Sequence, residues 1–273
     1  MTIAFAFSGG GNLGPMQAGS AVALLERGIE PDLLVGTSVG ALNAAFLSTR
    51  PGPAGARELV AAWTALARRQ AVRLNPLRAL AGLVGLSDHL VSDQQLRRLI
   101  DQWVPIDRIE EATTPLAVTA TDAVTGEGVL LTRGRIEDAL VASSAIPGLL
   151  PPVRVDGRWL VDGSLAANHP IIEAQMLGAD DVYAITTATA PRNRPPRGAV
   201  AAAMNSVSLV TARAGQRQLA EAEQNALATG SRVHLVPTSM PAAPGPFDFR
   251  RSAELAGSSY HRTAAWLADE VLR

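Results

Sequence analysis

A serine between two glycines is the residue best placed for chemistry in this sequence. Ser38 lies in the pattern Gly36-x-Ser-x-Gly40, after the apolar run 33–35 and before an alanine-rich stretch with helical periodicity. A strand, a sharp turn and a helix in this order form a nucleophile elbow, which presents the serine hydroxyl at the start of the helix. The amides and the positive dipole end of that helix can stabilise negative charge. The same pattern also fits an ordinary strand-to-helix turn, so its interpretation depends on the rest of the chain.

A second glycine-rich turn follows the first apolar run of the chain, residues 3–8. Gly9, Gly10 and Gly11 come directly after it and precede a helical pattern. Parallel strands that each run into a helix bring their carboxyl ends to the same edge of a sheet, so we expect this loop beside Ser38. Glycine amides let an acyl carbonyl approach closely, and the loop is therefore a candidate oxyanion hole.

The same loop also fits a different function. Gly9, Gly11 and Gly14 have the Gly-x-Gly-x-x-Gly spacing of a dinucleotide-binding turn. That site needs an acidic residue at the end of the second strand to hold the ribose. Here the second strand ends in Thr37 and Ser38. A non-catalytic nucleotide-binding or ligand-binding module remains an alternative, but the loop suits the serine better.

A carboxylate is the base that we expect to serve the serine. Asp162 ends a predicted hairpin over residues 153–161, whose Asp-Gly turn joins two short apolar strands. A Ser–Asp–His triad with His234 or His261, in the chain order of the α/β-hydrolase fold, is also formally possible. In that fold several strands precede the nucleophile, whereas here only one strand and one glycine loop precede Ser38. We therefore favour direct proton transfer to Asp162. A carboxylate with the usual pKa of about 3.9 is a poor base, so burial and close contact are required.

Composition excludes several other mechanisms. The 273-residue chain has no cysteine, and all 24 of its basic residues are arginines, so a thiolate nucleophile, a disulfide framework and a Ser–Lys dyad are impossible. A net charge of −1 gives no indication of nucleic-acid binding. The start of the chain lacks the basic region of a signal peptide, and no apolar run reaches the length of a membrane span. We expect a cytoplasmic protein, with transient contact at a membrane surface.

Four blocks of sequence together resemble the patatin-like phospholipases. They are Gly9–Gly14, Gly36–Gly40, Ala142–Pro147 with Pro151-Pro152, and Asp162–Ser164 with Asn168 and Pro170. The resemblance implies a lipid acyl hydrolase with Ser38 as nucleophile, Asp162 as base and the glycine loop as oxyanion hole. It also implies that no metal or organic cofactor takes part. Acyl transfer to an alcohol would use the same residues and stays open as an alternative.

The resemblance and the pattern of elements predict one domain over residues 1–273. We expect a three-layer α/β/α sandwich with a mostly parallel central sheet. The apolar, glycine-broken segment 73–91 is predicted to be a lid or an interfacial segment, with a buried helix pair as the alternative. The substrate is expected to be a lipid or another fatty-acyl ester. Two positions depart from the family pattern, namely Leu13 in place of a cation and Ser164 in place of glycine or alanine.

Overall fold

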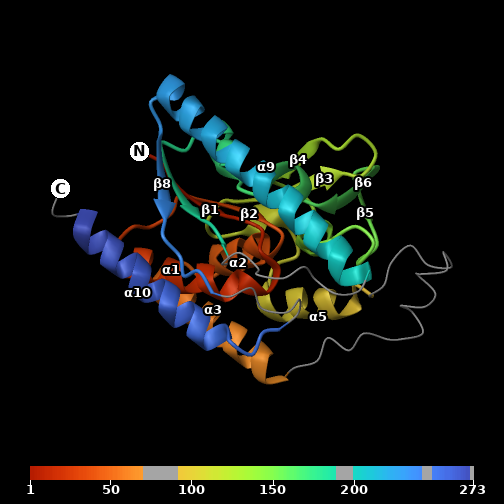
Figure 1. The fold of residues 1–273 in the computed structure, drawn as a ribbon, viewed down its shortest axis with the longest axis horizontal. Coiled ribbons are helices and arrows are strands. Elements are labelled where there is room, and N and C mark those ends of the chain that lie inside the picture. Colours follow the sequence, from red (N-terminus) through yellow and green to blue (C-terminus); the bar gives the residue numbers. More distant parts are fainter. Residues whose placement is uncertain (70–91, 189–198, 242–247, 271–273) are drawn as a thin grey trace.

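The computed structural model describes residues 1–69, 92–188, 199–241 and 248–270, and its central element is an eight-stranded sheet (Figure 1). The predicted lid segment 73–91 lies outside the described residues. The strands are β1 (Ile3–Phe7), β2 (Leu33–Thr37), β3 (Leu116–Asp122), β4 (Gly128–Leu131), β5 (Val153–Val155), β6 (Arg158–Asp162), β7 (Asp181–Ile185) and β8 (Arg232–Val236).

Helices cover both faces of this sheet. They are α1 (Gly14–Glu26), α2 (Val39–Ser48), α3 (Gly52–Arg69), α5 (Gln94–Trp103), α6 (Ile136–Ser143), α7 (Ser164–Ala167), α8 (Ile171–Met176), α9 (Ala199–Thr229) and α10 (Ser252–Glu270), with short 3-10 turns η1 (Gly11–Leu13) and η2 (Ile109–Glu111). Within the ranges that the structure describes, no helix is both long enough and apolar enough to cross a membrane.

The sheet is mixed, with a parallel centre. The path of hydrogen-bonded neighbours through the sheet is β5-β6-β3-β2-β1-β7-β8, and β4 also pairs with β3. Strands β8, β7, β1, β2 and β3 pair in parallel, whereas β4 and β6 both run antiparallel to β3. The parallel part has the crossover helices that such strands require. The predicted mostly parallel sheet is confirmed, and the antiparallel hairpin β5–β6 extends it.

Alternating residues of β1 show how the three layers form. Phe5 and Phe7 point to the face covered by α1, α2, α3 and α10, where the larger hydrophobic cluster lies. Ala4 and Ala6 point to the opposite face, where small side chains allow α8 and α9 to pack closely. Figure 1 shows α9 crossing one side of the sheet, with α1, α3 and α10 on the other. The predicted three-layer α/β/α architecture is confirmed.

One edge of β3 is shared by two strands that approach each other end to end. Strand β2 pairs along the first half of this edge, with its last residue Thr37 opposite Thr119. Strand β6 pairs along the second half, with its last residue Asp162 opposite Ala120. Strand β4 pairs with residues 118–121 of β3 and overlaps both of these stretches, so it occupies the other edge. The carboxyl ends of β2 and β6 therefore meet between two consecutive residues of β3.

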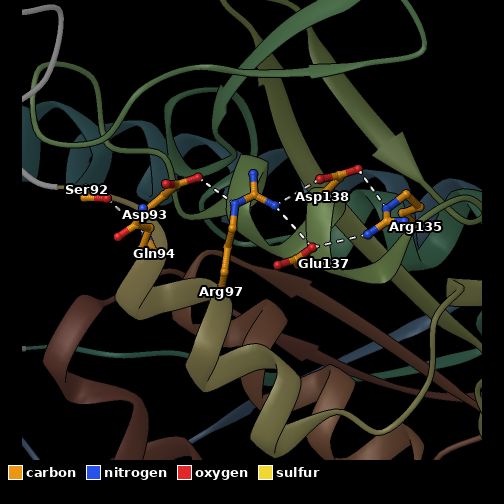
Figure 2. A network of polar contacts seen from close by, with 7 residues as sticks. All are labelled: Ser92, Asp93, Gln94, Arg97, Arg135, Glu137 and Asp138. Carbon is orange, nitrogen blue, oxygen red and sulfur yellow. Dashed lines mark hydrogen bonds and ion pairs between the residues drawn. The ribbon is translucent and has the colours of Figure 1, made fainter.

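A network of charged side chains joins the starts of α5 and α6 (Figure 2). Arg97 on α5 contacts Asp93 at 2.7 Å and Asp138 at 3.1 Å. It also lies 3.3 Å from Glu137, which together with Asp138 contacts Arg135 at the start of α6. These side chains are partly exposed, so each pair contributes no more than about 1 kcal/mol. The network joins the start of α6 to α5, and the last residue of α6, Ser143, contacts Ser38.

A chain of buried polar side chains connects the first three helices beneath the glycine loop. Asn43 on α2 donates to Gln17 Oε1 on α1 at 2.8 Å and to the Gly14 carbonyl at 3.0 Å. Trp63 on α3 donates from its indole nitrogen to Asn43 Oδ1 at 2.9 Å. Gln17 in turn donates to the Ser8 carbonyl at 2.8 Å, directly before the glycine loop. Each partner is buried, so loss of one member leaves several polar groups unpaired.

Replacing Asn43 by alanine is therefore expected to lower the free energy of unfolding by about 3 kcal/mol, because the hydrogen-bond partners of Asn43 stay buried. Urea unfolding monitored by circular dichroism measures this change. The control is Gln224→Ala, which removes an amide side chain from an exposed position of α9 and should alter stability by less than about 0.5 kcal/mol. Equal effects of the two substitutions would contradict a structural role for the buried chain.

Candidate active site

Ser38 lies at the turn between β2 and α2, in a backbone conformation that is rare for a residue with a side chain. Its φ is 54° and its ψ is −122°. The Ser38 carbonyl accepts the Ala41 amide at 2.9 Å, and α2 begins at the next residue. The Ser38 amide donates to the Ser143 hydroxyl at 2.8 Å. Such strain is maintained only where the surroundings hold the residue in place, and it is common at functional sites.

The two glycines of the elbow permit close packing. A Cβ at Gly40 would lie 2.3 Å from the Phe7 carbonyl oxygen and 2.5 Å from that of Ser8. A Cβ at Gly36 would lie 2.5 Å from the Ala41 Cα. The absence of side chains at these positions lets α2 fold back over β2 and approach the end of β1. The first turn of α2 therefore lies beside the glycine loop.

Asp162 is buried and contacts the serine directly. The Ser38 hydroxyl donates to Asp162 Oδ2 at 2.8 Å, and the Ser164 amide donates to Asp162 Oδ1 at 2.8 Å. Asp162 is 1% exposed and Ser38 is 7% exposed. Burial raises the pKa of the Asp162 carboxyl, and hydrogen bonds from Ser164 and Ser38 oppose part of this effect. The register at β3 thus brings together the two residues that sequence reasoning paired, although they are 124 positions apart.

The glycine loop lies next to Ser38. A Cβ at Gly9 would lie 3.7 Å from the Ser38 Cβ and 2.7 Å from Asn168 Oδ1. The Gly9 amide donates to the Asn168 carbonyl at 3.1 Å, so it serves the fold. Gly11 has a φ of 56°, and a Cβ there would meet no atom within 4 Å. The amides of Gly10 and Gly11 are the better candidates for contact with a bound oxyanion.

Side chains from outside the loop hold its first residues. The Gly9 carbonyl accepts the Ser8 hydroxyl at 3.0 Å and the Thr187 hydroxyl at 2.7 Å. The Thr187 amide donates to the Ser8 hydroxyl oxygen at 3.0 Å. Sequence patterns did not identify Thr187, because it lies far along the chain after β7 and belongs to no motif. The loop is fixed by long-range contacts.

The histidines considered for a triad lie elsewhere. His234, on the edge strand β8, forms a hydrogen bond of 2.9 Å with Asp181. His261 is exposed on α10, and its ring packs edge-on against Tyr260. The serine reaches Asp162 directly at 2.8 Å. In the described ranges, no group of three or more metal-binding side chains comes together.

The structure shows what surrounds Leu13 and Ser164, the two residues that depart from the family pattern. Leu13 is buried and packs with Met16 and with Leu255 of α10. Ser164 donates its amide to Asp162 Oδ1, and its side chain helps to lower the pKa of that carboxyl against the effect of burial. Leu13 therefore takes part in packing α10 onto the glycine loop, and the Ser164 side chain favours the ionised form of Asp162 in a way that glycine or alanine could not.

The family model for patatin-like phospholipases matches residues 5–174, and the chain belongs to the patatin-like phospholipase family. An uncharacterized NTE family protein of Mycobacterium tuberculosis is 32% identical over 186 residues, which cover 67% of this chain and 48% of that protein. Lysophospholipase NTE1 of Mycosarcoma maydis is 27% identical over 186 residues, which cover 68% of this chain and 10% of that protein. The chain thus spans about half, or less, of the length of these relatives.

Among solved structures, VipD from Legionella pneumophila aligns with a TM-score of 0.48 and 15% identity, covering 98% of this chain and 67% of that one.

The burial of Asp162 is expected to reduce stability at neutral pH. Its folded-state pKa is raised, so the carboxyl favours the folded state below the unfolded pKa of about 3.9, and this advantage is lost as the pH rises through the folded pKa. Asp162→Asn should therefore be more stable than wild type at neutral pH, and the difference should shrink toward pH values near 4. Urea unfolding at a series of pH values measures it.

Asp122 provides a control of opposite sign. The amides of Val124 and Thr125 hold the pKa of its carboxyl below the usual range. Asp122→Asn should therefore lose stability at neutral pH, and the loss should disappear as the pH falls through the folded pKa of Asp122. If Asp162→Asn behaved like Asp122→Asn, burial would not dominate the ionisation of Asp162.

Proposed function

We propose that the protein is a lipid acyl hydrolase that cleaves carboxylic esters with Ser38 and Asp162 as a catalytic dyad. The observation that carries the proposal is the 2.8 Å hydrogen bond from a serine in a strained elbow to a buried carboxylate. Membership of the patatin-like phospholipase family supports a lipid ester as substrate. One relative is named a lysophospholipase, which agrees with this class of substrate.

In the proposed reaction, the Ser38 oxygen attacks the acyl carbonyl while its proton passes to Asp162 Oδ2. The amides of Gly10 and Gly11 stabilise the tetrahedral oxyanion. Asp162 returns the proton to the leaving alcohol, and an acyl-serine remains. A water molecule then gives a proton to Asp162 and attacks the acyl group. Release of the fatty acid returns that proton to Ser38.

Burial makes this carboxylate a stronger base than one in water. A raised pKa increases the affinity of Asp162 for the serine proton. The same burial strengthens the hydrogen bond between the two side chains, because little water competes for it. Both effects supply the condition that a carboxylate needs to replace histidine as the base.

Ser38→Ala and Asp162→Asn are each expected to abolish turnover of p-nitrophenyl esters in folded protein, measured by release of p-nitrophenol. A fluorophosphonate should add one label to the wild type and none to Ser38→Ala, as seen by intact mass. Full activity in either variant would contradict the dyad. Wild-type protein that is neither labelled nor active would favour the alternative of a non-catalytic binding module. Product analysis with lipid esters, with and without an added alcohol, separates hydrolysis from acyl transfer.

The pH dependence of kcat/KM provides a separate test. Activity is expected to rise with pH through one ionisation, with a midpoint above the usual carboxyl pKa of about 3.9, because Asp162 must be ionised to accept the proton. His234→Gln should leave this profile unchanged, since His234 contacts Asp181. Loss of this ionisation from the profile of His234→Gln would contradict its assignment to Asp162.

A further inference from the structure

The last residue of α6 and the turn that follows it contact both members of the proposed dyad. The Ser143 hydroxyl accepts the Ser38 amide at 2.8 Å. The Ala145 carbonyl accepts the Asp162 amide at 2.9 Å, and the Ser143 carbonyl accepts the Gly163 amide at 3.2 Å. Ser143 is fully buried. Ser143 and Ala145 thus bind the main chain at the end of β6, and Ser143 also binds the elbow at the end of β2.

The hydrogen bond from Ser38 to Ser143 acts where the elbow is most strained. With a φ of 54°, Ser38 occupies a region that side chains make unfavourable, and the surrounding contacts must compensate. Its amide precedes the helix, so no intrahelical acceptor serves it. The Ser143 hydroxyl supplies that acceptor. Because the amide and the hydroxyl of Ser38 share one Cα, a fixed amide also limits where the hydroxyl can point.

We propose that Ser143 is a positioning residue that holds the Ser38 main chain in the conformation in which the hydroxyl reaches Asp162. This inference rests on the proposed function. Ser143 acts through the main chain of the nucleophile and does not contact the reacting atoms. The Ser143 carbonyl also accepts the amide of Gly163, the residue after Asp162. The main chain at or beside each member of the dyad is therefore hydrogen-bonded to the same residue. The elbow and the base then keep their separation when substrate binds.

The neighbouring residue offers a matched control. Ser144 lies in the same turn, and its hydroxyl oxygen is also buried, but it has no hydrogen-bond partner among the described residues. Ser143→Ala and Ser144→Ala therefore remove the same atom from adjacent positions. Only the first takes the acceptor from the Ser38 amide.

The kinetic test compares kcat and KM of these variants with a p-nitrophenyl ester. Ser143→Ala is expected to lower kcat by about 10- to 100-fold, since small displacements of a nucleophile have effects of this size. KM should stay near the wild-type value. Ser144→Ala should keep wild-type kcat. Ser143→Cys, whose side chain is close in size but is a weak acceptor, should also have a lower kcat than wild type. It replaces Ser143→Ala in this test if the alanine variant does not fold.

Amide hydrogen exchange measured by NMR tests the hydrogen bond without using activity. The Ser38 amide should exchange about tenfold faster in Ser143→Ala than in wild type, and at the wild-type rate in Ser144→Ala. A general loosening of the protein would instead accelerate exchange throughout β2.

The outcomes separate this inference from the proposed function. Equal kcat in Ser143→Ala and Ser144→Ala, with an active wild type, would overturn the positioning role. A loss of kcat without faster exchange at Ser38 would also overturn it. Wild-type protein without turnover or fluorophosphonate labelling would overturn the proposed function, and the inference with it.

Discussion

The site depends on the way in which one edge of β3 is divided. A strand can offer each stretch of one edge to a single neighbour, so β2 must leave where β6 begins. The change falls between Thr119 and Ala120. Because β2 and β6 run in opposite directions, their last residues meet there and the chain turns away at both ends. Ser38 and Asp162 lie together because of this pairing, and the glycine loop is brought alongside by the parallel pairing of β1 with β2.

The site contains two features that are unfavourable for the stability of the folded protein. A carboxylate is buried at the end of β6, and a residue with a side chain takes a positive φ at the end of β2. Each is unfavourable alone. Together they offset each other in part, because the Ser38 hydroxyl donates to the Asp162 carboxylate. The surrounding polar contacts are nearly all to main-chain atoms, which move less than side chains.

The buried polar residues around the site form hydrogen bonds between segments that are far apart in the sequence. Gln17, Asn43 and Trp63 link the first three helices to the main chain before the glycine loop. Thr187 and Ser143 bind the loop and the elbow from distant parts of the sequence. Such networks rigidify a core when every member is satisfied. Here they hold the glycine loop and the elbow in place.

The sequence alone determined the class of fold, the elbow and the pairing of a serine with a carboxylate. These follow from local signals: apolar runs, glycines at a turn, and Asp162 at the end of a hairpin. Tertiary structure decided the rest. It assigned the Gly9 amide to Asn168 and gave the Ser38 amide a partner in Ser143. Neither contact could be predicted, because hydrogen bonds between distant segments depend on strand register, and the sequence within each strand does not specify the register of its neighbour.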